Sequence, residues 1–476
     1  MTRAQSSSGN ALTLDMSLFP LHSKPRFKRG LALKKSLAGK LDDVNTLANI
    51  VRFWYQLRRN QWKRASELRK IQLKRLKAVV RHAYYNVPYY HRIFKSVRIK
   101  PEQIRNLEDL QRIPMTTKSD VQNNHSNFIS RNVDLSQCKI SFTSGSTGRP
   151  LKVISSPKAR YYSLALLQYP FFECGLKLRD KLVEVKVHLK NSDLRRPINI
   201  GFLGRMRIPS ENTIEENIRI LKKIRPDALY TYPSLLLLLA SEIEKKNIAE
   251  INPRLVFSHG ETLTPRGKQL VNSVLDTNVH NMYGSVEFNR LAFQCNKHSG
   301  LHMITDSAVI EIIKGDEPAG YDELGEIVVT GLYNYAMPFI RYKMGDVGAT
   351  TDERCDCGRS WPLIKRIEGR SNDFSVLPNG RIVSPMNLIE VMEPKYVKGV
   401  MQYQIIQEKK SYFLVKVIVN KKFNSEQISI IQRRMRTACL GEDVDVDVQV
   451  VNELVKDKTG KFRVVISKVK ASNLFG

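Results

Sequence analysis

The middle of the chain, residues 135–369, alternates strand-like with helix-like segments, and this alternation limits the fold more than any other feature. Short runs of β-branched and aromatic residues predict strands, and apolar residues behind a proline start signal predict a helix. We expect strands at 228–232, 254–258 and 326–330 and a helix at 235–245. Strands that alternate with helices are typical of a parallel sheet, so the sequence predicts the α/β class.

The two ends of the chain differ from the middle. From residue 380 onward, strand patterns at 403–407, 413–419 and 444–451 and a helical pattern at 425–439 predict a small α+β unit. Residues 41–95 have helical periodicity, and the glycine and polar residues at 369–373 indicate a hinge. We therefore expect three parts: a basic, poorly ordered lead-in at 1–40, a large N-terminal domain at 41–370 and a C-terminal domain at 371–476.

The chain is strongly basic, with a formal net charge of +31 over 476 residues. Residues 1–100 hold 23 Lys and Arg against 4 Asp and Glu. A basic surface attracts polyanions such as nucleic acid, anionic lipid or acidic substrates. General solubility is the other explanation, and both stay open. No zinc-finger or RNA-recognition motif stands out, so we expect no sequence-specific contact with nucleic acid.

Other features of the composition favour a cytoplasmic protein. The sequence has no apolar run of 18 residues, so we expect no transmembrane helix. Its start lacks the pattern of a secretory signal. Six cysteines in a chain of this length do not form a disulfide scaffold, which favours a reducing compartment.

A Ser/Thr/Gly-rich loop at residues 141–150 is the clearest candidate for ligand binding. Glycine allows close approach of the backbone, and successive N–H groups with hydroxyls can hold phosphate oxygens. The loop is not a Walker A motif, because no Gly-Lys-Ser/Thr follows at the required spacing. A flexible linker is the alternative.

Three later motifs add to this candidate. Tyr283, in the segment 281–287, can stack on a base, and Glu287 can hold Mg²⁺ beside phosphates. Asp346, after Gly345, can accept both hydroxyls of a ribose. Residues 456–463 form a basic glycine turn. Each motif taken alone also has an explanation without a ligand. Residues 281–287 could be a strand end, Gly345-Asp346 a turn, and residues 456–463 a solvated charge cluster.

In their order along the chain, these motifs resemble those of the adenylate-forming acyl ligase superfamily. The chain looks most like its phenylacetate–CoA ligase branch, especially the capsular-polysaccharide (CapK-type) members, because residues 76–90 are similar to that branch's N-terminal signature. The resemblance implies an adenylate-forming enzyme fold, with a large N-terminal α/β core and a small mobile C-terminal α+β domain.

The resemblance also implies a role for each matching residue. Lys461 and Glu287 would be catalytic, Lys461 bridging the carboxylate and the α-phosphate and Glu287 holding Mg²⁺. The family's ATP-binding positions fall on Thr143, Ser144, Gly145, Ser146, Thr147 and Gly148 (phosphates), Gly260, Glu261, Tyr283 and Gly284 (adenine), Asp346 (ribose) and Arg370 (ribose or phosphate). One departure is Val286, where the superfamily usually has threonine, which removes a hydroxyl near the reacting carboxylate.

A second constellation points to a metal. Cys295 and His302 precede the pair Cys355 and Cys357, and three thiols with one imidazole suit a closed tetrahedral Zn²⁺ site. Relatives in the phenylacetate–CoA ligase branch have a similar pattern. Free thiols are the alternative, and His298 is a substitute ligand for His302.

The sequence therefore predicts ATP-dependent activation of a carboxylic acid through an acyl-adenylate. The acyl group would pass to coenzyme A or to an amine or hydroxyl of a polysaccharide precursor, in capsular or exopolysaccharide biosynthesis. The expected cofactors are ATP, Mg²⁺, structural Zn²⁺ and coenzyme A. One expected partner is an anionic membrane surface, which the protein would contact peripherally at the inner face of the membrane. Another is a second copy of the chain, in a homodimer. The alternative is an inactive ligase scaffold that binds polyanions or membranes.

Overall fold

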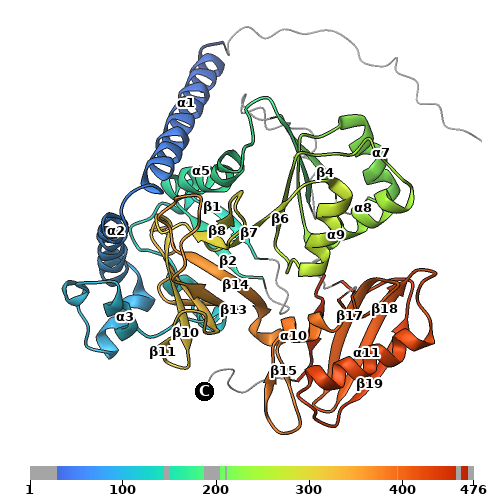
Figure 1. The fold of residues 1–476 in the computed structure, drawn as a ribbon. Helices are drawn as coiled ribbons and strands as arrows, with labels where there is room; N and C mark the ends of the chain where they lie inside the picture. The colour runs from blue at the N-terminus through green and yellow to red at the C-terminus, as the bar shows by residue number, and fades with distance from the viewer. Residues whose placement is uncertain are drawn as a thin grey trace, which may run out of the picture. The chain divides into compact units, whose positions relative to one another are not determined.

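The computed structural model describes residues 29–143, 150–186, 204–209, 212–393, 395–456 and 462–469, with side chains from Asn45 onward (Figure 1). The chain divides into two units, residues 1–48 and 49–476. Helix α1 (Arg29–Asn60) begins inside the segment that the sequence analysis assigns to the lead-in. Among the described helices, none is long and apolar enough to cross a membrane.

A twelve-stranded sheet forms the centre of the second unit, in the order β11-β10-β12-β13-β14-β9-β8-β7-β6-β5-β3-β4. Its parallel part consists of β3 (Lys181–Lys186), β4 (Gly204–Pro209), β5 (Ala228–Thr231), β6 (Leu255–His259) and β7 (Val279–Ser285). Its antiparallel part consists of β8 (Asn289–Gln294), β9 (Leu301–Met303), β10 (Ala308–Lys314), β11 (Glu317–Pro318), β12 (Gly325–Gly331), β13 (Tyr342–Thr351) and β14 (Leu363–Arg370). The predicted α/β class is confirmed, and an antiparallel half extends the parallel strands.

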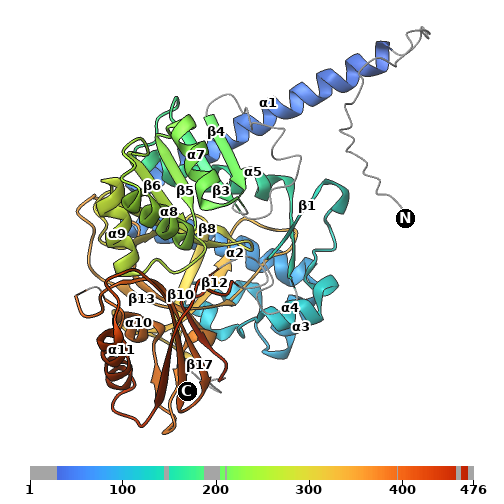
Figure 2. The ribbon, with the colours of Figure 1, turned by 90° about the vertical axis from the view of Figure 1, so that its right-hand side faces the viewer.

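Three helices pack against one face of the parallel strands, as Figure 2 shows. They are α7 (Ile214–Ile224), α8 (Pro233–Lys245) and α9 (Pro265–Leu275). Thr213 and Glu216 close a capping box at the start of α7, with the Glu216 carboxylate accepting from the Thr213 amide at 2.9 Å. Leu236 and Leu239 of α8 are fully buried in the same cluster as Val256 of β6.

Helix α5 (Pro157–Glu173) packs on the opposite face of the same strands. On β6, Phe257 clusters with residues of α5, whereas the preceding residue Val256 clusters with α8. Successive residues of a strand point to opposite faces, so α5 and α8 sandwich the strand between them. The same alternation puts Tyr230 of β5 on the α5 face and Leu229 on the α8 face.

The N-terminal helices of the second unit pack on the antiparallel half of the sheet. They are α2 (Ala65–Asn86), α3 (Pro88–Ser96) and the short α4 (Lys118–Asn123). The apolar face of α2 is buried as its periodicity predicts, at Leu68, Leu76, Val79 and Val80. Two strands outside the large sheet, β1 (Lys139–Phe142) and β2 (Lys152–Ser155), pair antiparallel on either side of the Ser/Thr/Gly loop.

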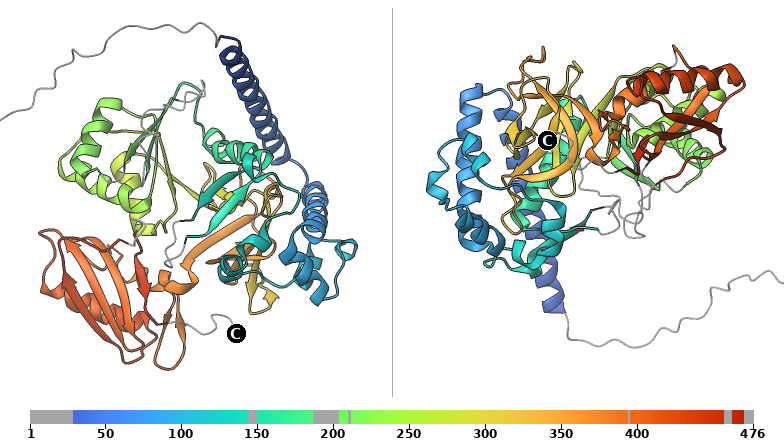
Figure 3. Two further views of the ribbon diagram at one scale, coloured as in Figure 1. Left: turned by 180° about the vertical axis from the view of Figure 1, so that it is seen from behind. Right: turned by 90° about the horizontal axis from the view of Figure 1, so that it is seen from below.

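The C-terminal part has a separate hydrophobic core, formed by residues 377–465. Its sheet has the order β19-β18-β17-β20, and α11 (Ser425–Ala438) packs on it (Figure 3). The strands are β17 (Val400–Lys409), β18 (Tyr412–Val419), β19 (Asp445–Val450) and β20 (Val465–Ser467). The pair β15 (Ser375–Val376) and β16 (Ile382–Val383) and helix α10 (Pro385–Glu390) precede them. The predicted α+β elements are therefore present.

Candidate functional site

The carboxyl ends of β5, β6 and β7 bring several of the predicted residues to one edge of the sheet. These strands are parallel, and ligands of open α/β sheets bind outside such an edge. Strand β6 ends at His259, and Gly260 follows with a φ of +78°, which favours glycine. In β7, a Cβ on Gly284 would lie 1.8 Å from the carbonyl oxygen of Asn289, so only glycine fits there.

Tyr283, Asp346 and Arg370 form a connected group beside this edge. The Tyr283 hydroxyl donates to Asp346 Oδ2 at 2.7 Å, and Arg370 Nε pairs with Asp346 Oδ1 at 3.1 Å. Burial raises the pKa of Tyr283, and the neighbouring Asp346 raises it further, so the hydroxyl stays protonated and donates. Both carboxylate oxygens of Asp346 retain lone pairs for further donors such as ribose hydroxyls.

Glu287 lies close to this group. The Tyr342 hydroxyl donates to its Oε1 at 3.2 Å, which leaves the second carboxylate oxygen available to a cation. Lys118, at the start of α4, was missed by the sequence analysis. Burial lowers the pKa of Lys118, and the charges that act on it are those of Glu287 and Arg370. In the sequence, Lys118 looks like part of an ordinary helix start, because Thr117 and Asp120 form the cap of α4, and nothing there indicates a binding site.

The carboxylate of Glu261 connects two parts of the chain. Its Oε2 accepts from the Ser234 amide at 3.0 Å, at the start of α8. Its Oε1 accepts from the Phe462 amide at 2.9 Å, in the C-terminal part of the chain. Glu261 thus connects the edge of the core to the residue that follows Lys461.

Thr143 closes the base of the Ser/Thr/Gly loop. Its amide donates to the Leu151 carbonyl at 2.9 Å, and its hydroxyl accepts from the Leu151 amide at 2.8 Å. The remaining predicted residues Ser144, Gly145, Ser146, Thr147, Gly148 and Lys461 lie outside the described residues. Their roles stay predictions.

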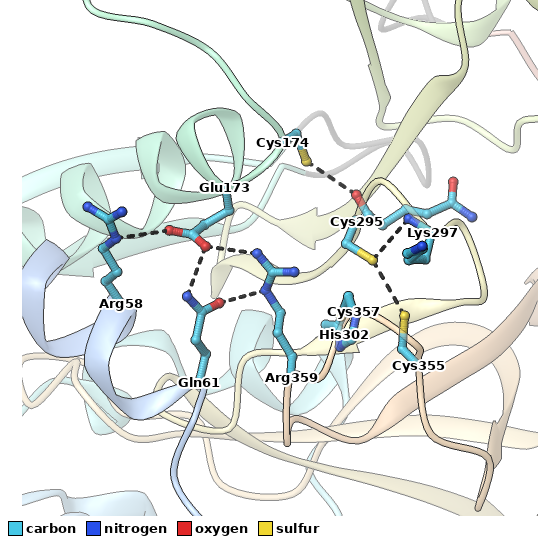
Figure 4. A network of polar contacts seen from close by, with 11 residues as sticks. Arg58, Gln61, Glu173, Cys174, Cys295, Lys297, His302, Cys355, Cys357 and Arg359 are labelled. Atoms are coloured by element: carbon cyan, nitrogen blue, oxygen red, sulfur yellow. Dashed lines mark hydrogen bonds and ion pairs between the residues drawn. The ribbon is translucent and has the colours of Figure 1, made fainter.

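The four predicted zinc ligands come together from separate strands and a loop, as Figure 4 shows. Their ligand atoms all lie within 4.8 Å of one another, with Cys295 Sγ 3.5 Å from Cys355 Sγ and Cys357 Sγ 3.3 Å from His302 Nε2. Thiolate sulfurs lie about 2.3 Å and imidazole nitrogens about 2.0–2.1 Å from a tetrahedral Zn²⁺, which puts the ligand atoms roughly 3.5–3.8 Å apart. The two pairs at 3.5 and 3.3 Å are close to this spacing, so the donor set fits Zn²⁺. His298 is not in this group, because its ring stacks on His280 at 4.7 Å.

The His302 ring has the orientation that a metal ligand needs. Its Nδ1 lies 3.4 Å from the Trp361 carbonyl, so this nitrogen carries the proton and Nε2 faces the thiols. Burial lowers the pKa of His302 to about 4, which keeps the imidazole neutral and its lone pair available.

A polar network surrounds the cluster, and the sequence analysis did not predict it. Arg359 donates to Gln61 Oε1 at 2.6 Å and to Glu173 Oε2 at 2.8 Å, and Gln61 donates to the same Glu173 oxygen at 2.8 Å (Figure 4). Arg359 also acts on the Cys357 thiol, whose pKa is lowered because the effect of Arg359 outweighs that of burial. One arginine thus connects the cysteine turn to the end of α5 and to the residue that follows α1.

Comparison with known proteins agrees with this fold. A family model described as the CapK C-terminal domain matches residues 376–468. Phenylacetate-coenzyme A ligase of Thermus thermophilus is 27% identical over 71% of this chain and 78% of its own length. Protein CapK of Staphylococcus aureus is 24% identical over 85% of this chain and 90% of its own length.

Solved structures show the same architecture. A crystal structure of 2-hydroxyisobutyryl-CoA ligase in the postadenylation state superposes with a TM-score of 0.73 at 20% identity, over 86% of this chain and 91% of that one. The chain is therefore a relative of the phenylacetate–CoA ligases and of CapK: it has the fold of the adenylate-forming CoA ligases, and residues 376–468 match the CapK C-terminal domain.

Proposed function

We propose that this protein is an AMP-forming ligase that activates a carboxylic acid with ATP and transfers the acyl group to coenzyme A. The observation that carries the proposal is the group of Tyr283, Asp346 and Arg370, with Glu287 nearby, at the ligand-binding edge of the parallel strands. Several relatives are phenylacetate-coenzyme A ligases, which does not favour the alternative of an inactive scaffold.

The reaction needs help because a carboxylate is a weak nucleophile and ATP is highly charged. The carboxylate oxygen attacks the α-phosphorus, the bond to the β-phosphate breaks, and pyrophosphate leaves. Negative charge spreads over the equatorial phosphate oxygens, so positioned cations and donors supply most of the catalysis. Asp346 and Tyr283 would fix the nucleoside, and Arg370 and Lys118 would place positive charge near the phosphates. Glu287 would hold Mg²⁺, which neutralises phosphate charge when bound.

In the second step, the acceptor attacks the acyl carbon and AMP leaves. We propose coenzyme A as the acceptor first, because the names of the phenylacetate-coenzyme A ligases include it. Similarity to CapK supports a second acceptor, an amine or hydroxyl of a capsular polysaccharide precursor. In that case, α2 would contact an anionic membrane from the cytoplasmic side, because Lys70, Lys74, Lys77 and Arg81 form an exposed stripe along it.

We propose that the cluster of three cysteines and His302 holds a structural zinc ion. The site offers four protein ligands, and a closed tetrahedral site of this kind stabilises the fold and does not bind substrate. A homodimer is proposed on the resemblance alone.

The test is pyrophosphate release with Mg-ATP over a panel of aryl, fatty, amino and dicarboxylic acids. Release should depend on the acid and should collapse in Lys461→Ala, which removes the lysine proposed to bridge the carboxylate and the α-phosphate. Thioester formation with coenzyme A then identifies the acceptor. Acid-independent release, or equal release from wild type and Lys461→Ala, would contradict the proposal.

A further inference from the structure

The two fully buried arginines of the described chain differ sharply in their partners. They are Arg290 and Arg341, each 3% exposed. Arg341 pairs with the Glu311 carboxylate at 3.1 Å and also donates to the carbonyls of Gln111 and Ile113 at 3.0 and 2.8 Å. Arg290 has one hydrogen bond to the protein, from Nη2 to the Tyr230 hydroxyl at 3.0 Å.

The charge of Arg290 is therefore not balanced within the described part of the chain. Its Nε has no hydrogen-bond partner, and no described carboxylate pairs with it. Two cation–π contacts with Tyr230 involve Arg290 and Arg205, at 5.9 and 5.8 Å from the ring centroid. Burying an unpaired charge is costly, and proteins usually meet that cost with an opposite charge.

Glu184 of β3 stands opposite Tyr230 in the β3–β5 pair, and its carboxylate binds other arginines. Glu184 pairs with Arg205 at 2.9 Å and with Arg207 at 2.9 Å. Two guanidiniums thus share one carboxylate, and Arg290 adds a further positive charge next to them. Arg290 itself has no described carboxylate partner, and a buried guanidinium in that position suits an anion.

The guanidinium of Arg290 lies beside the proposed nucleotide site. Arg290 stands opposite Gly284 in the β7–β8 pair, one residue from Tyr283 of the proposed nucleotide site. The Arg290 guanidinium, from β8, contacts Tyr230 of β5, and strands β6 and β7 lie between β5 and β8 in the sheet. The two side chains therefore meet over the carboxyl ends of β6 and β7, at the ligand-binding edge.

The surroundings on this face are aromatic. The Tyr230 ring stacks on the His259 ring at 4.2 Å and packs edge-on against Phe171 of α5 at 5.0 Å. Tyr230 also belongs to the hydrophobic cluster that lies between α5 and the sheet. A ligand group that reaches Arg290 would thus extend from the nucleotide site along apolar side chains to one buried charge.

We propose that Arg290 binds a second acidic group of the acyl substrate, so that the acid activated by this enzyme is a dicarboxylate. The inference rests on the proposed function and deepens it. One carboxylate of the substrate meets the α-phosphate, and the other forms a charge-assisted pair with Arg290 while accepting from the Tyr230 hydroxyl. Tyr230 acts as a positioning residue for the guanidinium.

The experiment compares matched pairs of acids, such as butyrate with succinate and phenylacetate with its 4-carboxy derivative. Wild type should favour the diacid of at least one pair in kcat/KM for pyrophosphate release. Arg290→Met should lower that preference about 100-fold. Without the guanidinium, the second carboxylate of a diacid would be buried with no opposite charge, and a buried polar group without a partner is strongly disfavoured. The KM for ATP should not change, and Arg290→Lys should recover part of the preference.

Tyr230→Phe serves as the second variant, since it keeps the ring and leaves Arg290 in place. It should lower the diacid preference several-fold, and it keeps the test valid if Arg290→Met does not fold. A wild type that favours monoacids, with the same selectivity in both variants, would overturn the proposal and leave the ligase function intact. A rise confined to the KM for ATP would instead assign Arg290 to the triphosphate and would also overturn it.

A thermal-shift measurement separates this proposal from the ligase function. If no acid supports pyrophosphate release, but diacids stabilise wild type and not Arg290→Met, the anion site stands and the proposed function fails. If diacids stabilise neither protein and none is a substrate, the Arg290 site fails as well.

Discussion

Asp346 is the residue on which the proposed nucleotide site depends most. Its side chain is 13% exposed and binds two groups from different strands, the Tyr283 hydroxyl and the Arg370 guanidinium. The register of the β13–β14 pair puts Arg370 directly across from it. Asp346 therefore holds Tyr283 and Arg370 together, and in the proposed site its oxygens would bind the ribose.

The variant Asp346→Asn should weaken ATP binding about 10- to 100-fold, because hydrogen bonds to charged groups contribute about 1.5–3 kcal/mol. The amide keeps the shape of the carboxylate but leaves Arg370 without its anion. Titration calorimetry with Mg-ATP measures the loss. Asp352→Asn, at an exposed aspartate of the same region, is the control. Unchanged affinity in a folded Asp346→Asn protein would contradict the assignment.

His280 predicts a pH dependence of stability. Burial lowers its pKa to about 4, and its Nδ1 donates to the Gln294 carbonyl at 3.3 Å. In the unfolded chain, the group titrates near 6.5, so between these values the unfolded state binds more protons. The free energy of unfolding should therefore fall as pH drops from about 6.5 to about 4, by about 3 kcal/mol from this group.

Urea unfolding of wild type and His280→Gln across this pH range isolates the contribution. Glutamine keeps a donor for the Gln294 carbonyl but does not titrate. Toward acid pH, the free energy of unfolding of the wild type should fall by about 3 kcal/mol relative to that of His280→Gln. Curves that stay parallel from pH 7 to pH 4 would show that His280 is protonated without cost.

At the scale of elements, the proposed zinc site joins parts that are distant in the chain. The ligands come from the end of β8, from β9 and from the loop between β13 and β14, and Arg359 extends the connection to Gln61 and Glu173. When a residue that contacts a metal ligand is removed, the affinity for the metal typically falls 10- to 100-fold.

Arg359→Met should therefore lower zinc affinity by about that factor while all four ligands remain. Competition with a zinc-binding dye measures the affinity, and metal analysis should find one zinc ion per chain in the wild type. The exposed Arg354 supplies the control variant Arg354→Met. If both variants bind zinc as wild type does, Arg359 has only a packing role.

The same elements explain how much could be predicted. Strand β5 and helix α8 carry their own periodicity and start signals, so the local sequence predicts them. The antiparallel strands pair over long separations, as when Leu363 of β14 meets His302 of β9, and no local pattern contains that information. The cysteine and histidine pattern predicted four candidate zinc ligands, because few other side chains bind that ion, and these four side chains lie together in the structure. Arg290 and Lys118 could not be found, because their surroundings arise only when distant strands meet.

At the scale of the whole second unit, Glu261 connects the core to the C-terminal part. It holds the start of α8 through Ser234 and the amide of Phe462, next to Lys461. Arg266 adds a further connection, donating to the carbonyls of Met392 and Val400. These contacts matter if the C-terminal part acts as the predicted mobile lid, because the position of a lid often controls turnover.

Glu261→Gln should therefore affect the two half-reactions unequally. Loss of one charge-assisted bond to the Phe462 amide costs about 1.5 kcal/mol, which corresponds to a roughly tenfold lower rate of adenylation if this contact holds Lys461 in place. Thioester formation from preformed acyl-adenylate should keep its wild-type rate, because the role proposed for Lys461 is confined to adenylation. ATP–pyrophosphate exchange and single-turnover thioester formation measure the two steps. Glu244→Gln, at an exposed position of α8, is the control. Equal losses in both steps would show that Glu261 serves ATP binding and not the position of the C-terminal part.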